Sequence, residues 1–239
     1  MTAVPHPRRS SRTPASAAAG APVERASIPI REWAGLAAGA CRGWHVAAVP
    51  AGQGSPPGHR VRSMVLTRRS VLLLAADEFE DMELLYPLYR LREEDVAVTV
   101  AGLDDQPVTG KKGHGPVPVD CPVGQVAADD FDALVIPGGY APDKLRRSQA
   151  VLALVRAFDE AGKPIAFICH AGWVPISAKI VKGRRATSVA AIRDDMVNAG
   201  VNWVDQAAVV DGNLISARTP ADLGPWMKAL LAALDMPGS

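Results

Sequence analysis

The sequence has few cysteines, no long hydrophobic run and almost no net charge. Its 239 residues include three Cys, a small and odd number that excludes a disulfide framework. The sequence has no Cys-x-x-Cys pair, the usual sign of a structural zinc site. No stretch of 18 or more uninterrupted apolar residues is present, so a transmembrane helix is not expected. A formal net charge of +1 gives no reason to expect nucleic acid as a partner. With 48% hydrophobic residues, the chain can nevertheless form a sizeable core.

The charge is unevenly distributed along the chain. Residues 1–69 carry ten Arg, no Lys and two acidic residues, a net charge of +8, and the remainder carries −7. The first 63 residues have three interpretations: a targeting peptide, a basic disordered arm, or an extension outside the mature protein, because Met64 precedes the first strong strand. In each case no fold is expected in residues 1–63, and one domain is expected over residues 64–239.

From Ser70 onward, predicted strands alternate with predicted helices. The run Ser70–Ala76 (SVLLLAA) is apolar throughout, which is typical of a strand buried on both faces of a parallel sheet. The further strands are expected at 96–101, 131–136, 164–169, 186–189 and 203–210, the helices at 81–94, 143–162, 172–181, 192–199 and 221–234, a hairpin-like excursion at 107–120 and a tight turn at 211–213. This alternation predicts an α/β fold, a mostly parallel sheet with helices on both faces.

Three of the predicted strands end in unusual residues. They are followed by Asp77–Glu80, by Pro137–Tyr140 (PGGY) and by Cys169–Gly172 (CHAG). In parallel α/β sheets, chemistry takes place at the carboxyl ends of the strands, which lie along one edge. The sequence therefore predicts a functional site where these three turns meet.

Cys169 is the strongest candidate in that site. A cysteine on a tight strand-to-helix turn presents its sulfur to the crevice, and the N-terminus of the following helix favours the thiolate. The N–H groups of His170 and Gly139 could then stabilise an oxyanion. The alternative is that Cys169 is a small buried hydrophobic residue. Cys41 and Cys121 are interpreted as non-functional.

Histidine and carboxylates restrict the chemistry further. His114 and His170 are the histidines of the expected domain, so a triad whose histidine follows the nucleophile is not available. Four acidic residues lie within six positions, namely Glu78, Glu80, Asp81 and Glu83. Any one of them that faces the thiolate would have a raised pKa and could move a proton, whereas the others would form a solvated first helical turn. No metal site and no cofactor-binding motif is evident.

Several segments, in order, are similar to those of the PfpI family, within the class I glutamine-amidotransferase-like superfamily. The similarity runs from Ser70 to Leu234 and is carried by ADEFEDMELLYP (76–87), DALVIPGG (132–139), ICH (168–170), DDMVNAGVNWVDQAAVVDGNLISAR (194–218) and PADL (220–223).

This resemblance implies a flavodoxin-like three-layer sandwich, a cytoplasmic location and assembly into a homodimer or homohexamer. It implies Cys169 as the nucleophile, Glu80 as the acid hydrogen-bonded to it, and an oxyanion hole formed by the N–H groups of Gly139 and His170. In family members described as peptidases, the histidine pairs with an acid from a neighbouring subunit, and the matching residue is Asp143.

The chain departs from the family pattern at several positions around this site. Ala171–Trp173 replaces Gly-Pro-Gln, Tyr140 stands where a basic residue is common, and Val189–Ala190 replaces an aromatic residue followed by Pro. Asp143 is one methylene shorter than the usual Glu. These departures weaken the expectation of a triad between subunits more than they affect Cys169 and Glu80.

Three functions follow from these observations. The first is a cofactor-free cysteine enzyme, of the glyoxalase III or deglycase type, that acts on 2-oxoaldehydes or on glycated proteins in carbonyl stress. The second is an intracellular peptidase that uses Cys169, His170 and Asp143 across a subunit interface. The third is a redox-sensing chaperone, in which oxidation of Cys169 changes a binding surface.

Overall fold

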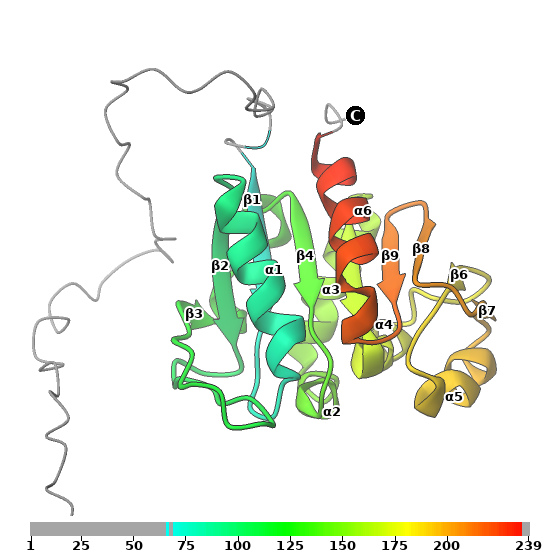
Figure 1. The fold of residues 1–239 in the computed structure, drawn as a ribbon, viewed down its shortest axis with the longest axis horizontal. Helices are drawn as coiled ribbons and strands as arrows, with labels where there is room; N and C mark the ends of the chain where they lie inside the picture. Colours follow the sequence, from blue (N-terminus) through cyan, green and yellow to red (C-terminus); the bar gives the residue numbers. More distant parts are fainter. Residues whose placement is uncertain (1–65, 67–68, 236–239) are drawn as a thin grey trace, which may run out of the picture. The chain divides into compact units, whose positions relative to one another are not determined.

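A computed structural model describes residue 66 and residues 69–235, so the expectations for residues 1–63 lie outside the described residues. A seven-stranded sheet forms the centre of the domain (Figure 1). In spatial order its strands are β3 (Cys121–Pro122), β2 (Ala97–Gly102), β1 (Ser70–Leu74), β4 (Ala133–Ile136), β5 (Ile165–Ile168), β9 (Leu214–Ala217) and β8 (Ala208–Asp211). All neighbouring strands are parallel except β8 and β9, which form an antiparallel pair at the edge.

The apolar runs form the central strands because helices cover both faces of the sheet. Leu72 of β1 lies opposite Thr99 of β2 and Leu134 of β4, and Leu72 and Leu134 are fully buried. A strand in this position has no solvent-facing side, which explains why its sequence does not alternate between apolar and polar residues.

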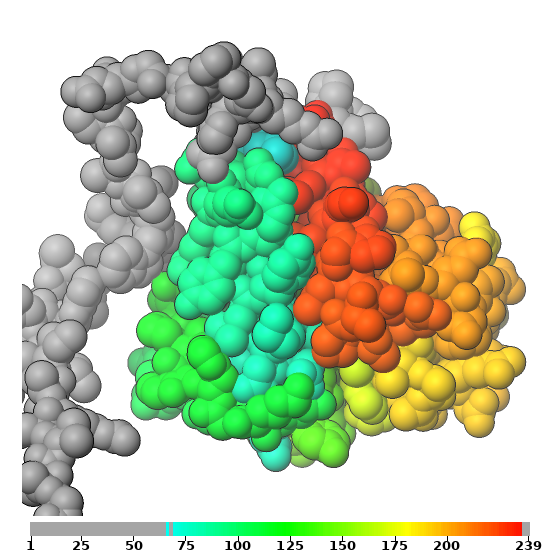
Figure 2. All heavy atoms as spheres, viewed as in Figure 1, coloured from blue at the N-terminus to red at the C-terminus, as the bar shows by residue number. Residues whose placement is uncertain are grey.

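Helices α1 (Asp81–Glu93) and α6 (Leu223–Asp235) lie side by side on one face, as Figures 1 and 2 show. Helices α3 (Gln149–Glu160) and α4 (Trp173–Ala178) contact each other on the opposite face. The predicted fold class, a mostly parallel flavodoxin-like sheet between helical layers, is confirmed.

A smaller group of elements lies beside the β8 edge of the main sheet, as Figure 1 shows. A separate two-stranded parallel sheet is formed by β6 (Arg185–Ala186) and β7 (Asn202–Trp203), close to helix α5 (Arg193–Asn198). The expected turn at 211–213 is confirmed, since Gly212 has a φ of +57° between β8 and β9.

The strand expected at 186–189 is shorter, since β6 ends at Ala186, and two further predicted elements are divided. The single helix expected at 143–162 is two helices, α2 (Ala141–Leu145) and α3, because the Ser148 hydroxyl caps a new helix by accepting a bond from the Val151 N–H. The strand expected at 203–210 is also divided, between β7 and β8. None of the described helices has the length and hydropathy needed to cross a membrane.

Candidate functional site

The three unusual strand ends meet, as predicted, at the carboxyl edge of the sheet. Phe79, after β1, forms an antiparallel bridge with Gly139, after β4. The N–H of Glu80 donates to the Gly138 carbonyl at 3.1 Å, and the N–H of Tyr140 donates to the Glu78 carbonyl at 2.8 Å. These bonds hold the first two turns together beside the third turn, which follows β5.

Cys169 begins that third turn in a left-handed conformation. Its φ is +62°, which a non-glycine residue rarely adopts and which is a feature of strand-to-helix elbows that carry nucleophiles. The backbone N–H groups of Gly139 and His170 donate to its sulfur. Only 7% of the residue is exposed, so the thiol is nearly enclosed.

The acid beside the thiol is Glu83, and the expectation that Glu80 takes this position is wrong. Glu83 is fully buried, its Oε2 accepts a hydrogen bond from the Gly138 N–H at 2.8 Å, and its carboxyl interacts with Cys169. The other oxygen, Oε1, is buried and has no hydrogen-bond partner among the described residues. Oε1 is therefore well suited to carry a proton, since a protonated carboxyl could donate to the sulfur.

A sequence signal for Glu83 existed. The buried positions of α1 include Leu84, Pro87 and Leu91, and Glu83 lies four residues before Pro87 on the same face. An acidic residue on the core-facing side of a helix is either neutralised or functional. Glu80 has a similar spacing, four residues before Leu84, and the structure separates the two acids because Glu80 is the extended N-cap residue of the helix.

Glu80 instead pairs with two lysines that sequence reasoning missed. It is 3% exposed, and its carboxylate lies 2.5 Å from Lys111 Nζ and 2.7 Å from Lys112 Nζ. Both lysines belong to the 107–120 excursion, which the structure folds back through an antiparallel bridge between residues 108 and 117. The only sequence signal for this ion pair was the presence of two adjacent lysines in the excursion.

Asp81 attaches this excursion to the start of α1. Its carboxylate accepts hydrogen bonds from the N–H groups of Lys112 and His114, both at 3.0 Å. At Gly110 a Cβ would lie 2.6 Å from Asp81 Oδ1, so a side chain at this position would push the loop away. The loop and its lysines are thereby fixed next to the site.

The electrostatics differ from the expectation of a free thiolate. Burial, together with the Glu83 carboxylate, raises the pKa of the Cys169 thiol to about 12, which outweighs the two backbone donors. Burial likewise raises the pKa of Glu83 to about 7. Two acids in one enclosed space share their protons, so protonation of Glu83 removes the repulsion that opposes the thiolate.

His170 does reach the sulfur. Its Nδ1 lies 3.3 Å from Cys169 Sγ, because the left-handed turn brings neighbouring side chains to the same side. Burial, followed by the charge of Lys111, lowers the pKa of His170, and the imidazole is therefore neutral near pH 7.

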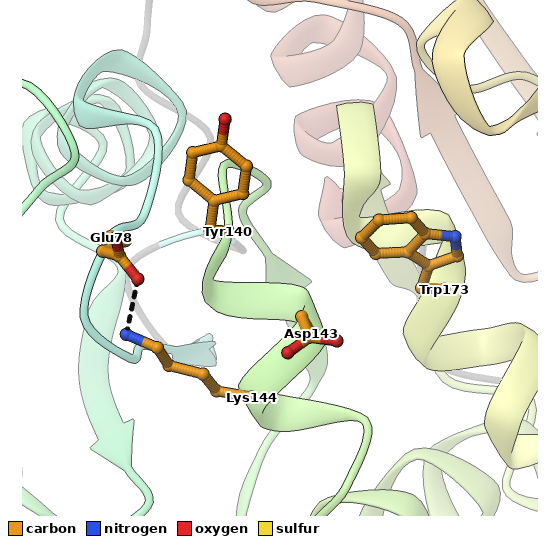
Figure 3. Close-up of a pocket in the computed structure, with 5 residues that line it drawn as sticks. All are labelled: Glu78, Tyr140, Asp143, Lys144 and Trp173. Atoms are coloured by element: carbon orange, nitrogen blue, oxygen red, sulfur yellow. Dashed lines mark ion pairs between the residues drawn. The ribbon is translucent and has the colours of Figure 1, made fainter.

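Asp143 lies in an open pocket of about 390 Å³ next to this site (Figure 3). The pocket is lined by Glu78, Tyr140, Asp143, Lys144 and Trp173. The Trp173 ring centroid is 5.3 Å from that of His170, so the pocket adjoins the imidazole. Asp143 is exposed and lies 3.7 Å from Arg147, and its expected pairing with a histidine of another subunit stays a prediction.

The departures from the family pattern have clear local contacts. A Cβ at Gly172 would lie 2.8 Å from Met196 Sδ, so this glycine permits close packing against α5. The Trp173 Nε1–H donates to Asp195 at 2.8 Å, which fixes the ring beside His170. The Val189 N–H donates to the Cys169 carbonyl at 3.4 Å.

Within the part of the chain that the structure describes, no group of three or more His, Cys, Asp or Glu side chains could hold a metal ion. Cys121 is buried in β3, which is separated from β4 by β2 and β1, and Cys41 lies outside the described residues.

Comparisons with known proteins agree with this arrangement. Residues 69–233 match the model of the DJ-1/PfpI family. Over 164 residues, which are 69% of this chain and 98% of the relative, the sequence is 47% identical to Deglycase PfpI from Pyrococcus furiosus. It is 39% identical to the Putative cysteine protease YraA of Bacillus subtilis, over 70% of this chain and 98% of that protein. The crystal structure of Drosophila melanogaster DJ-1beta superimposes with a TM-score of 0.64 at 33% identity, over 72% of this chain and 91% of the other. The chain belongs to the DJ-1/PfpI family.

Proposed function

We propose that this protein is a cofactor-independent cysteine enzyme that acts on 2-oxoaldehydes, such as methylglyoxal, or on their adducts with protein amines and thiols. The observation that carries the proposal is the enclosed pair of Cys169 and Glu83, a nucleophile beside a carboxyl whose pKa lies near neutrality. The names of its relatives, deglycase and putative cysteine protease, support an enzyme of one of these two types.

The proposed reaction uses the Cys169 sulfur as the nucleophile and the Glu83 carboxyl in both its protonated and its ionised form. The Cys169 sulfur attacks the aldehyde carbon of methylglyoxal, and the carbonyl oxygen takes up a proton to give a hemithioacetal. A base removes the remaining proton from that carbon and an acid returns one to the adjacent carbon, which leaves a thioester of lactate. Water then hydrolyses the thioester, so the net change is methylglyoxal plus water to lactate, with no oxidant required.

Each group has a part in the proposed reaction. Glu83 carries the transferred proton, because its pKa of about 7 allows it to give and to accept one at neutral pH. The N–H groups of Gly139 and His170 face the reacting sulfur and would stabilise the negative charge on the attacked oxygen. In a deglycase reaction the same attack releases the amine or thiol of the adduct.

The enclosed sulfur favours a small substrate. With 7% of Cys169 exposed, an aldehyde group can approach more easily than an extended peptide can. The neutral His170 also argues against a resting thiolate–imidazolium pair of the kind used by many cysteine peptidases.

The proposal is tested by measuring methylglyoxal consumption and lactate formation with the purified full chain. We expect activity in the native protein, none in Cys169→Ala, and a loss of at least about a hundredfold in Glu83→Gln, which removes the proton carrier. Glu80→Gln is the matched control, since this acid pairs with lysines, and it should retain activity within about tenfold. An inactive native protein, or full activity in Cys169→Ala, would contradict the proposal.

Peptide hydrolysis is the second candidate function. It is favoured by the 3.3 Å approach of His170 Nδ1 to the sulfur and by the name of the Bacillus subtilis relative. This function requires Asp143 from a neighbouring subunit of a homodimer or homohexamer, and dissociated subunits would then lose it.

A further inference from the structure

We propose that Lys111, whose backbone is bonded to the turn after β1 and whose ammonium group lies on the Glu80 carboxylate, is a positioning residue that promotes ionisation of the Cys169 thiol through its positive charge. This inference rests on the proposed function of Cys169 as the nucleophile. The inference adds a residue of the 107–120 excursion, between β2 and β3, to a site formed otherwise by the turns after β1, β4 and β5.

The backbone fixes the place of Lys111. Its N–H donates to the Phe79 carbonyl at 2.9 Å, directly before Glu80. The neighbouring Gly110 N–H donates to the His114 carbonyl at 2.7 Å, and Asp81 accepts from Lys112 and His114. Backbone hydrogen bonds at residues 110, 111 and 112 therefore fix the position of the main chain at Lys111.

The charged groups around the sulfur come from three segments. From α1 and its N-cap come Glu83, beside the sulfur, and Glu80, whose charge acts on Glu83. From the turn after β5 comes His170, which is neutral near pH 7. From the excursion come Lys111, which interacts electrostatically with both Cys169 and Glu83, and Lys112, which pairs with Glu80.

Glu80 does not act on Lys111 alone, because its carboxylate is shared by two ammonium groups, at 2.5 Å and 2.7 Å. The second carboxylate of the cluster, Asp81, accepts a hydrogen bond from the Lys112 N–H and so offsets the charge of Lys112. The Lys111 side chain is 32% exposed, against 63% for that of Lys112, so solvent screens its charge less. Of this pair, Lys111 therefore has the larger effect on the sulfur.

Alkylation of Cys169 by iodoacetamide measures this effect without any turnover. The reagent is neutral and reacts with the thiolate, so its rate against pH reports thiol ionisation. The full chain is treated between pH 6 and pH 10, and labelling at Cys169 is followed by peptide mass spectrometry, which separates it from Cys41 and Cys121.

Lys111→Met should lower the alkylation rate at pH 7.5 about three- to tenfold and shift the profile to higher pH, because one nearby positive charge is lost. Lys112→Met, which removes the other lysine from the same carboxylate, should change the rate by less than about twofold. Lys111→Arg keeps the charge and should restore the native profile to within about twofold. Lys111→Gln, which retains a hydrogen-bond donor for Glu80, repeats the test if Lys111→Met does not fold.

Two results would overturn the inference: an unchanged profile in the folded Lys111 variants, or equal shifts in the Lys111 and Lys112 variants. If the profile shifts as expected in a protein that does not consume methylglyoxal, the proposed function fails and the electrostatic inference stands.

Discussion

The Gly138 N–H donates to Oε2 of Glu83 across 2.8 Å and so joins the turn after β4 to the first turn of α1. The same glycine lies against Cys169, since a Cβ at position 138 would be 2.7 Å from the Cys169 Cβ and 2.5 Å from Glu83 Oε2. The Pro-Gly-Gly turn therefore makes room for the Cys169–Glu83 pair and also orients it.

A methyl group at this position should disrupt the site. Gly138→Ala places a Cβ within 2.9 Å of the Ile168 carbonyl oxygen as well, and backbone cannot move aside easily. We expect a loss of about 1 to 3 kcal/mol in the free energy of unfolding and a loss of methylglyoxal turnover. Gly124→Ala is the control, because a Cβ there meets nothing within 4 Å, and it should change stability by less than about 0.5 kcal/mol. Equal effects of the two substitutions would refute the steric argument.

The raised pKa of Glu83 should be visible in the pH dependence of stability. The pKa rises from 4.5 to about 7 on folding because burial disfavours the charged carboxylate. The native state therefore binds more protons than the unfolded state between these values. Its stability from this group is fully present below pH 4.5 and is lost as the pH rises to about 7, by an amount on the order of 3 kcal/mol.

Urea unfolding of the native protein and of Glu83→Gln, from pH 4 to pH 8, isolates this contribution. The native protein should lose stability relative to the variant as the pH rises, and the difference should level off above pH 7. A difference that stays constant across the range would show that Glu83 titrates normally in the folded state.

The strand ends and the position of Cys169 on a strand-to-helix turn could be predicted from the sequence. Apolar runs such as Ser70–Leu74 and Ile165–Ile168 end in Gly-, Pro- or acid-containing turns, and the parallel fold places those ends on one edge. These signals are local in sequence, so they do not depend on knowledge of the packing.

The choice between the acids and the ionisation of the thiol depends on packing. Glu80 and Glu83 are three residues apart, and one helical boundary residue decides which of them faces the core. Lys111 lies 31 positions from Glu80, and no short-range pattern joins the two. The thiol pKa depends on how completely water is excluded, a property of the assembled turns.

The attachment of the excursion to Asp81 can be tested independently of activity. In Asp81→Asn the side-chain amide nitrogen replaces one of the two oxygens that accept from Lys112 and His114, so one of these hydrogen bonds is lost. We expect faster hydrogen exchange at the N–H groups of Lys112 and His114 and a cost of about 1 to 3 kcal/mol in stability.

Asp77→Asn serves as its control. Asp77 accepts a single bond at Oδ1, from the Thr109 N–H at 2.8 Å, and an asparagine carbonyl can keep it. Exchange at residues 112 and 114 should then remain as in the native protein. If both substitutions increase exchange there equally, the loop is held by something other than Asp81.

His170→Ala separates the two candidate activities. The substitution removes the imidazole 3.3 Å from the sulfur and leaves the backbone N–H that donates to it, so the stabilisation of an oxyanion is retained. A peptidase needs the imidazole to protonate the leaving amine, and its activity should fall by at least about a hundredfold. In the proposed methylglyoxal reaction the protons move through Glu83, so this activity should change by less than about threefold. His114→Ala, in the excursion, controls for a general effect of losing a histidine. Both reactions should be assayed on one preparation. A loss of methylglyoxal turnover in His170→Ala would show that the imidazole, and not Glu83, transfers the proton.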